Sequence, residues 1–131
     1  MTRFVVDASA VIQLASEQID VPSTHQLLAP TLLRSQVLSL LHESVHRNEL
    51  TAAAARSVLA RSGRIKIRYL GDAVLRRRAW DVAEKLGQAS TYHAEYIALT
   101  QLQADALVTV DDEIARLATN LVHVATIDDL R

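Results

Sequence analysis

The chain has 131 residues, half of them hydrophobic, no cysteine and a formal net charge of −1. This length allows one domain with its own core, and the lack of cysteine excludes disulfides, thiolate metal sites and cysteine nucleophiles. No stretch approaches the roughly 20 apolar residues that span a bilayer, and the short apolar run before Asp7 is unlike a signal peptide, so we expect a single cytoplasmic domain over residues 1–131.

Short β-prone runs alternate along the chain with segments whose apolar residues recur at helical spacing. In chain order, the predicted elements are a strand at 3–6, a helix that begins after Asp7, a strand at 27–29, helices at 31–47 and 51–63, a strand at 64–70, helices at 72–86 and 92–103, a strand at 106–109, a helix at 111–118, a strand at 122–125 and a last turn at 127–130. Strands that alternate with helices imply parallel crossovers. We therefore expect an α/β fold, a three-layer α/β/α sandwich with a mainly parallel sheet.

Two of the predicted strands lead into acids. Asp7 follows the first strand directly, and Asp111 follows the strand at 106–109 by way of Val110. Because the carboxyl ends of parallel strands meet at one edge of a sheet, where functional sites usually lie, we expect the two carboxylates to come together. Each acid also precedes a helix, so capping is the alternative for either one alone.

A close pair of carboxylates needs a cation. Two such charges about 4 Å apart repel by about 4 kcal/mol at an effective dielectric constant near 20, so one keeps a proton or a metal ion neutralises the pair. We expect Asp7 and Asp111 to hold Mg²⁺ or Mn²⁺, a hard cation that can activate water and stabilise a phosphoryl transition state. The hydroxyls of Ser9 and Thr109 would position water or ligands, while Asp112 is expected to cap the following helix.

Basic residues are concentrated in the middle of the chain. Eight of the 14 Lys and Arg residues lie between Arg56 and Arg78, with Asp72 the only acid among them. Six of them form two groups, one alternating along the predicted strand at 64–70 and one in the next predicted helix. The first group is Arg64, Lys66 and Arg68, and the second is Arg76, Arg77 and Arg78. Such an uneven charge distribution can mark a binding face; a solvated surface or a protein interface is the alternative.

Four segments resemble the PIN-domain family, particularly the VapC toxins of bacterial toxin–antitoxin pairs. In family order and at family-like spacing, they are Phe4–Ala10, Ala29–Val37, Tyr92–Leu99 and Leu107–Asp111. The resemblance implies a metal-dependent ribonuclease fold, commonly dimeric, that is paired with a cognate antitoxin. An RNA substrate would need cations to neutralise its phosphates, so the two basic groups described above are then expected to bind RNA.

Two positions depart from the family pattern. The family has Glu where Gln36 stands and usually Asp where His93 stands, whereas Asp7 and Asp111 keep the pattern. These four are the catalytic positions that the resemblance implies. Gln36 can still offer a neutral carbonyl oxygen. His93 can ligate through a ring nitrogen that suits Mn²⁺ or Zn²⁺ better than Mg²⁺, or it can simply pack near the start of its helix.

These observations predict a toxin-like endoribonuclease that cleaves RNA phosphodiesters with a metal-activated water. The alternative is a catalytically weakened PIN-like binding module that keeps the dimer and antitoxin contacts, and Gln36 and His93 favour it. An aspartyl phosphotransfer domain is a third candidate, but no second acid stands two residues after Asp7.

Overall fold

Five parallel strands form one sheet in the computed structural model, which describes residues 1–131. The strands are β1 (Thr2–Val6), β2 (His25–Pro30), β3 (Arg68–Leu70), β4 (Ala106–Val108) and β5 (Val124–Ala125). They lie in the order β3-β2-β1-β4-β5, and every neighbouring pair is parallel. The parallel sheet expected from the sequence is confirmed.

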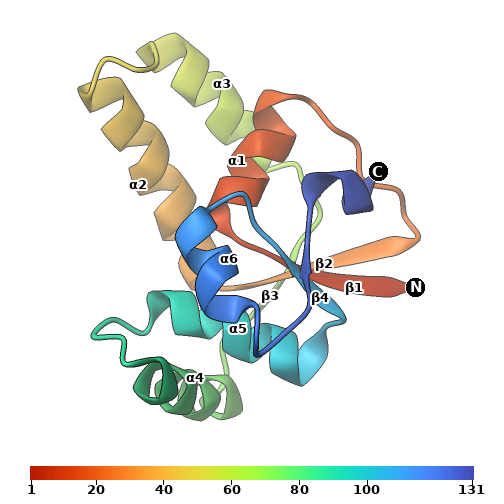
Figure 1. The fold of residues 1–131 in the computed structure, drawn as a ribbon. Helices are drawn as coiled ribbons and strands as arrows, with labels where there is room; N and C mark the ends of the chain where they lie inside the picture. The colour runs from red at the N-terminus through yellow and green to blue at the C-terminus, as the bar shows by residue number, and fades with distance from the viewer.

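Helices cover both faces of this sheet (Figure 1). They are α1 (Ala8–Ser16), α2 (Leu32–His46), α3 (Ala52–Ser62), α4 (Ala73–Leu86), α5 (Tyr92–Gln103) and α6 (Asp112–Ala118), and a final 3-10 turn, η1, covers Ile127–Leu130. The first three helices pack together on one side, and α4 packs with α5 on the other. This is the expected three-layer sandwich. None of the helices combines the length and apolar character that crossing a bilayer requires.

The ends of several helices follow from single residues. The hydroxyl of Thr51 accepts a hydrogen bond from the Ala54 N–H at 3.1 Å and begins α3. The carboxylate of Asp72 does the same for α4, accepting from the Leu75 N–H at 2.8 Å. Gly87 ends α4 with a left-handed φ of 66°, a conformation that glycine adopts without a side-chain penalty.

The strand predicted at 64–70 is wrong over its first half, because β3 contains only Arg68–Leu70. The N–H groups of Arg64 and Ile65 donate to carbonyls of α3, at 3.1 and 3.3 Å, so the chain is still turning out of that helix. The alternation of charged and apolar residues in this segment corresponds to alternating exposure: Lys66 is exposed, whereas Ile65 and Ile67 are half-buried.

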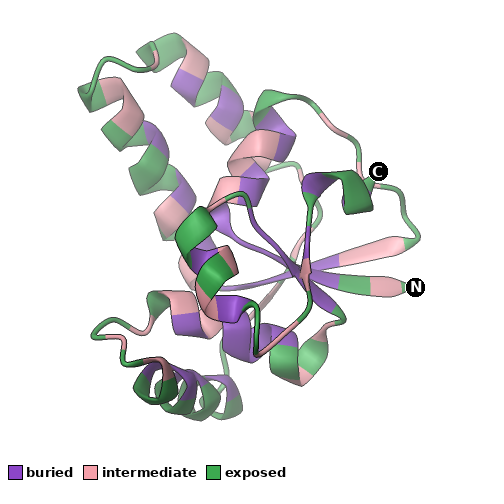
Figure 2. Cartoon of the chain, in the orientation of Figure 1, coloured by how far each residue is buried: buried purple, intermediate pink, exposed green.

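The core is almost entirely apolar. It contains 33 buried hydrophobic residues, concentrated in the strands and on the helix faces that contact them (Figure 2). Only three polar side chains are buried, those of Asp7, Thr100 and Thr109. Thr100 is satisfied within its own helix, where its hydroxyl donates to the Tyr96 carbonyl at 2.8 Å. The other two meet at the carboxyl edge of the sheet and need a separate explanation.

Candidate active site at the carboxyl edge of the sheet

Asp7 is the centre of a hydrogen-bond network at the end of β1. Its Oδ1 accepts bonds from the Ser9 hydroxyl at 2.7 Å and from the Ala10 N–H at 2.9 Å, and its Oδ2 accepts one from the Thr109 hydroxyl. The bond to Ala10 makes Asp7 the N-cap of α1. The carboxylate is only 1% exposed, so these contacts hold its orientation rigidly.

Thr109 connects Asp7 to Asp111. The register of β1 and β4 pairs Val6 with Val108, so the next residue of each strand lies beside the other. While the Thr109 hydroxyl donates to Asp7, its oxygen accepts from the Asp111 N–H at 2.9 Å. One hydroxyl therefore joins the two acids at the carboxyl edge, as the two strand ends predicted.

Asp111 has a structural role and one unoccupied oxygen. Its Oδ1 accepts from the Ile114 N–H at 3.0 Å and caps α6, whereas its Oδ2 accepts no hydrogen bond. The expectation that Asp112 caps this helix in a capping box with Thr109 is wrong: that box requires a helix starting at Val110, whereas α6 starts at Asp112 with Asp111 as its N-cap, and Asp112 is an exposed first-turn residue. Helix capping and proximity of the two acids are therefore not exclusive: Asp7 and Asp111 each cap a helix, and both lie at the same carboxyl edge of the sheet.

Burial dominates the electrostatics of Asp7. Desolvation raises the pKa of this carboxyl above its ordinary value, the hydrogen bonds from Thr109, Ala10 and Ser9 oppose that rise, and the charge of Asp111 adds to it. The network therefore compensates only part of the cost of holding a buried negative charge. A bound cation would compensate more of it.

Gln36 reaches this edge from α2 and is held by Tyr96 of α5. The Tyr96 hydroxyl, on a side chain only 1% exposed, donates to the Gln36 Oε1. Burial and the charge of Asp7 both raise the pKa of Tyr96, so its proton stays on the phenol and Tyr96 remains a donor. The carbonyl oxygen that Gln36 would offer to a metal thus already has a partner.

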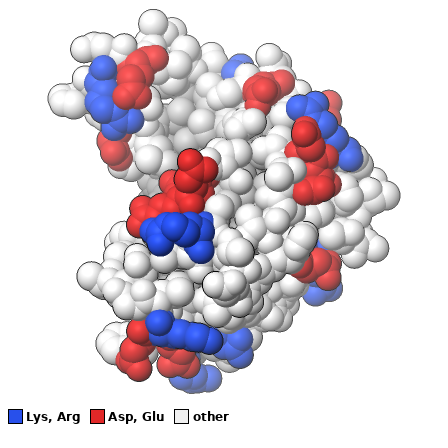
Figure 3. Space-filling model, in the orientation of Figure 1, with Lys and Arg blue, Asp and Glu red and all other residues white.

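His93, at the start of α5, faces an acid that the sequence did not suggest. Its Nε2 lies 3.9 Å from the Oε2 of Glu113 in α6, and its buried Nδ1 has no hydrogen-bond partner. The two side chains are 30% and 57% exposed. Acidic side chains gather over α6, beside the recess between α2 and α4 (Figure 3).

The donors at this edge fit a cation that keeps much of its water. Asp7 and the free Oδ2 of Asp111 offer carboxylate oxygens, the ligand that Mg²⁺ and Mn²⁺ take in proteins. No group of three or more His, Asp or Glu side chains is arranged to hold a metal ion. The residues therefore fit a site in which two carboxylates bind the cation and water supplies its remaining ligands. They do not fit a site in which protein side chains supply every ligand.

The two basic groups lie on different parts of the molecule, and neither joins the hydrogen-bond network around Asp7. Arg76, Arg77 and Arg78 are exposed on α4, with Arg78 donating to the Gln101 Oε1 at 3.1 Å. The other three, Arg64, Lys66 and Arg68, line a groove that also includes Met1 and His25, at the opposite, amino edge of the sheet. Their predicted contact with RNA remains a prediction.

Tyr96 and Glu113 are the site residues that sequence reasoning missed. Tyr96 stands in a run of buried residues in α5, where a phenol hydroxyl must find a partner, and that requirement was the available signal. Glu113 lies two residues after Asp111 but contacts a side chain from another helix, which no local pattern indicates.

Comparisons with curated proteins find VapC ribonucleases. The chain is 31% identical over 110 residues to a VapC ribonuclease of Mycobacterium bovis and to ribonuclease VapC9 of Mycobacterium tuberculosis. Each alignment covers 82% of this chain and 84% of the relative. No protein-family model matches the chain.

Solved structures share the fold. PAE2754 from Pyrobaculum aerophilum superposes with a TM-score of 0.75 at 23% identity, covering 98% of this chain and 92% of that one. VapBC-1 from nontypeable Haemophilus influenzae gives 0.56 at 13% identity, covering 96% and 98%. A PilT N-terminus domain protein of Sulfolobus solfataricus gives 0.52 at 18% identity, covering 98% and 89%. At these identities the likeness concerns the fold alone.

Proposed function

Because this chain belongs to the VapC family of PIN-domain toxins, we propose that it is the ribonuclease of a toxin–antitoxin pair and that it cleaves RNA with a divalent metal, Mg²⁺ or Mn²⁺, held by Asp7 and Asp111. The observation that carries the proposal is the Thr109 hydroxyl, which joins a buried Asp7 to Asp111 at the carboxyl edge of the sheet. A core that is otherwise apolar accommodates this polar cluster at a cost in stability, as binding and catalytic sites commonly do.

Each residue of the site has a separate task in this proposal. Asp7 and Asp111 bind the cation, Ser9 and Thr109 hold the Asp7 carboxylate in place, and the Ser9 oxygen accepts the Val110 N–H at 3.1 Å, which ties the two strand ends together. A bound metal ion would lower the pKa of its water and stabilise the charge of a phosphoryl transition state. The in-line geometry of hydrolysis then depends on the rigidity of these four side chains.

A second candidate function rests on the other two family positions. Gln36 is neutral and accepts a hydrogen bond from Tyr96, and the Nε2 of His93 lies 3.9 Å from the Oε2 of Glu113. With two acids absent, a PIN-like binding module of weak activity is the alternative to an active ribonuclease. Metal affinity distinguishes the two, because an active site must hold its cation at cellular concentrations.

RNA and protein partners complete the proposal. We assign phosphate contacts to Arg76, Arg77 and Arg78, whose exposed positions on α4 suit a solvent-accessible polyanion. An antitoxin and a second copy of the chain would cover apolar side chains that are now exposed, among them Leu38 at 55% and Trp80 at 65%. The VapBC-1 likeness supports an antitoxin partner for a fold of this kind.

Cleavage of RNA by protein purified free of antitoxin tests the proposal. We expect cleavage with Mg²⁺ or Mn²⁺, none with a chelator, and loss of cleavage in Asp7→Asn. The matched control is Asp81→Asn, which removes an exposed acid of α4 that makes no hydrogen bond or ion pair. Metal-independent cleavage, or equal activity of Asp7→Asn and the control, would show that the site lies elsewhere. If the wild type is inactive and Gln36→Glu with His93→Asp restores cleavage, the binding-module candidate is correct.

A further inference from the structure

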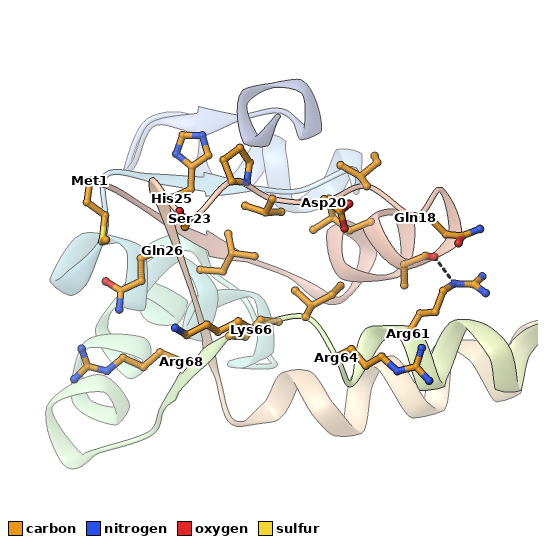
Figure 4. Close-up of a pocket in the computed structure, with 18 residues that line it drawn as sticks. Met1, Gln18, Asp20, Ser23, His25, Gln26, Arg61, Arg64, Lys66 and Arg68 are labelled. Atoms are coloured by element: carbon orange, nitrogen blue, oxygen red, sulfur yellow. Dashed lines mark hydrogen bonds between the residues drawn. The ribbon is translucent and has the colours of Figure 1, made fainter.

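A basic, partly apolar cavity lies away from the two acids, at the amino edge of the sheet. This amino-edge groove has a volume of about 650 Å³ and is bounded by Met1, the end of α1 with the loop that follows it, the first half of β2, the end of α3 and the segment that leads into β3 (Figure 4). Asp7 stands at the other end of β1. A ligand in the groove would therefore contact none of the residues of the candidate active site.

The groove is strongly basic along one side. Arg61, Arg64, Lys66 and Arg68 line that side, and Asp20 is the single acid among the lining residues (Figure 4). The Arg61 Nε donates to the Ala15 carbonyl at 2.8 Å, so this side chain is already engaged. The other three make no side-chain hydrogen bond or ion pair within the chain. Three cations are thus free to meet a negatively charged ligand.

The floor of the groove is aliphatic. Leu14 and Leu27 are buried there, and Ile19, Ile65 and Ile67 are half-buried. No Phe, Tyr or Trp lines the groove. Recognition of single-stranded RNA relies largely on bases stacking against aromatic rings or arginine planes, and the one aromatic ring among the lining residues, His25, already packs edge-on against Phe4 with the ring centroids 5.2 Å apart. Apolar side chains of a peptide would instead bury surface against these residues.

The backbone beside the floor can also receive a peptide. β3 is an edge strand, and the N–H groups of Lys66 and Ile67, just before it, donate to no backbone carbonyl. Extended peptides commonly bind by adding to such an edge. His25, another lining residue, has a buried Nδ1 without a partner. Main-chain, apolar and charged contacts are therefore available on one surface.

We propose that the amino-edge groove binds an extended acidic peptide segment of a partner protein, with acidic side chains paired to Arg64, Lys66 and Arg68 and apolar side chains on the aliphatic floor. The positive charge of the groove favours an acidic partner, and its aliphatic floor favours a peptide with apolar side chains over RNA. This site is separate from the proposed ribonuclease site, and its occupancy does not require Asp7.

Fluorescence anisotropy with a labelled short peptide of alternating glutamate and leucine tests the proposal. We expect the double variant Arg64→Glu, Lys66→Glu to weaken binding by at least about tenfold, because it replaces two attractive contacts with like-charge repulsion. The matched control is Arg56→Glu, Lys85→Glu, which makes the same charge change at two exposed residues outside the groove. The control variant should bind the peptide within about twofold of the wild type at physiological ionic strength, because its two residues are exposed, do not line the groove, and act on it only through charges that salt screens.

Two altered peptides and one further variant of the protein test the proposal independently. A peptide with serine in place of leucine should bind more weakly, and one with lysine in place of glutamate should not bind. Asp7→Asn should bind the acidic peptide as the wild type does, even if it abolishes RNA cleavage. The proposal is overturned if both double variants lose affinity equally, if the serine peptide binds as well as the leucine peptide, or if oligouridylate displaces the peptide and loses affinity in the same groove variant, which would mark an RNA site. Circular dichroism establishes that each variant is folded.

Discussion

Replacement of Thr109 by valine isolates the contribution of the hydroxyl that joins the two acids. Valine keeps the shape of threonine but removes a donor to Asp7 and the acceptor of the Asp111 N–H. A hydrogen bond to a charged group contributes about 1.5–3 kcal/mol, and an unpaired buried N–H costs about 1 kcal/mol more. We expect Thr109→Val to lower the free energy of unfolding by about 2–4 kcal/mol.

Urea denaturation followed by far-UV circular dichroism measures this change. Thr109→Ser is the matched control, because it keeps the hydroxyl and loses one methyl group, at a cost of about 1 kcal/mol. The difference between Thr109→Val and the wild type should shrink as the pH falls, since protonated Asp7 no longer receives a charge-assisted bond. If the valine variant is as stable as the serine variant at neutral pH, the hydroxyl does not hold the site together.

The remaining predictions concern charge, metal affinity and one turn. Burial raises the pKa of Asp7, so its titration favours the folded state fully below the ordinary carboxyl pKa of about 4, and this stabilisation is lost as the pH rises through the raised value. The Asp7→Asn variant should therefore become more stable relative to the wild type as the pH rises from about 4 to about 7 in urea titrations. A difference in unfolding free energy that stays the same over this range would contradict the assignment. Gln36→Glu should tighten Mn²⁺ binding by about tenfold in calorimetry, because it adds a carboxylate beside Tyr96 and near Asp7; unchanged affinity would place Gln36 outside the cation site. Gly87→Ala should lower the melting temperature, at a cost of about 1–2 kcal/mol, because φ is 66° there; an unchanged value would mean that the turn rearranges freely.

Local patterns were sufficient for most of the fold. The apolar run before Asp7 and the run before Asp111 end at the same edge because the strands are parallel and adjacent, which the alternation of strands and helices implies. The start of α6 was harder to predict, because the sequence at 109–112 allows either a capping box with Thr109 as N-cap and Asp112 in the first turn, or a helix capped by Asp111 two residues later, which is the one observed.

Side-chain contacts between segments that are distant in the chain could not be predicted from the sequence. The bond from Tyr96 to Gln36 joins α5 to α2, and the approach of His93 to Glu113 joins α5 to α6, so neither has a local signature. The alternation in 64–70 predicted that Arg64 and its basic neighbours share a face. It could not show that this face belongs to the amino edge, because strand order and register decide which end of the sheet a segment approaches.

The central claim is that Asp7 and Asp111 together bind one divalent cation. Calorimetric titration of Mn²⁺ into the wild type, Asp7→Asn, Asp111→Asn and Asp112→Asn tests it most directly, because Asp112 is an exposed neighbouring acid without a hydrogen bond. We predict one site in the wild type, a loss of affinity of at least about tenfold in each of the first two variants, and a change within about threefold in Asp112→Asn, because this carboxylate is exposed and makes no hydrogen bond to the site. Equal affinities in all four proteins, or equal losses in all three variants, would contradict the claim.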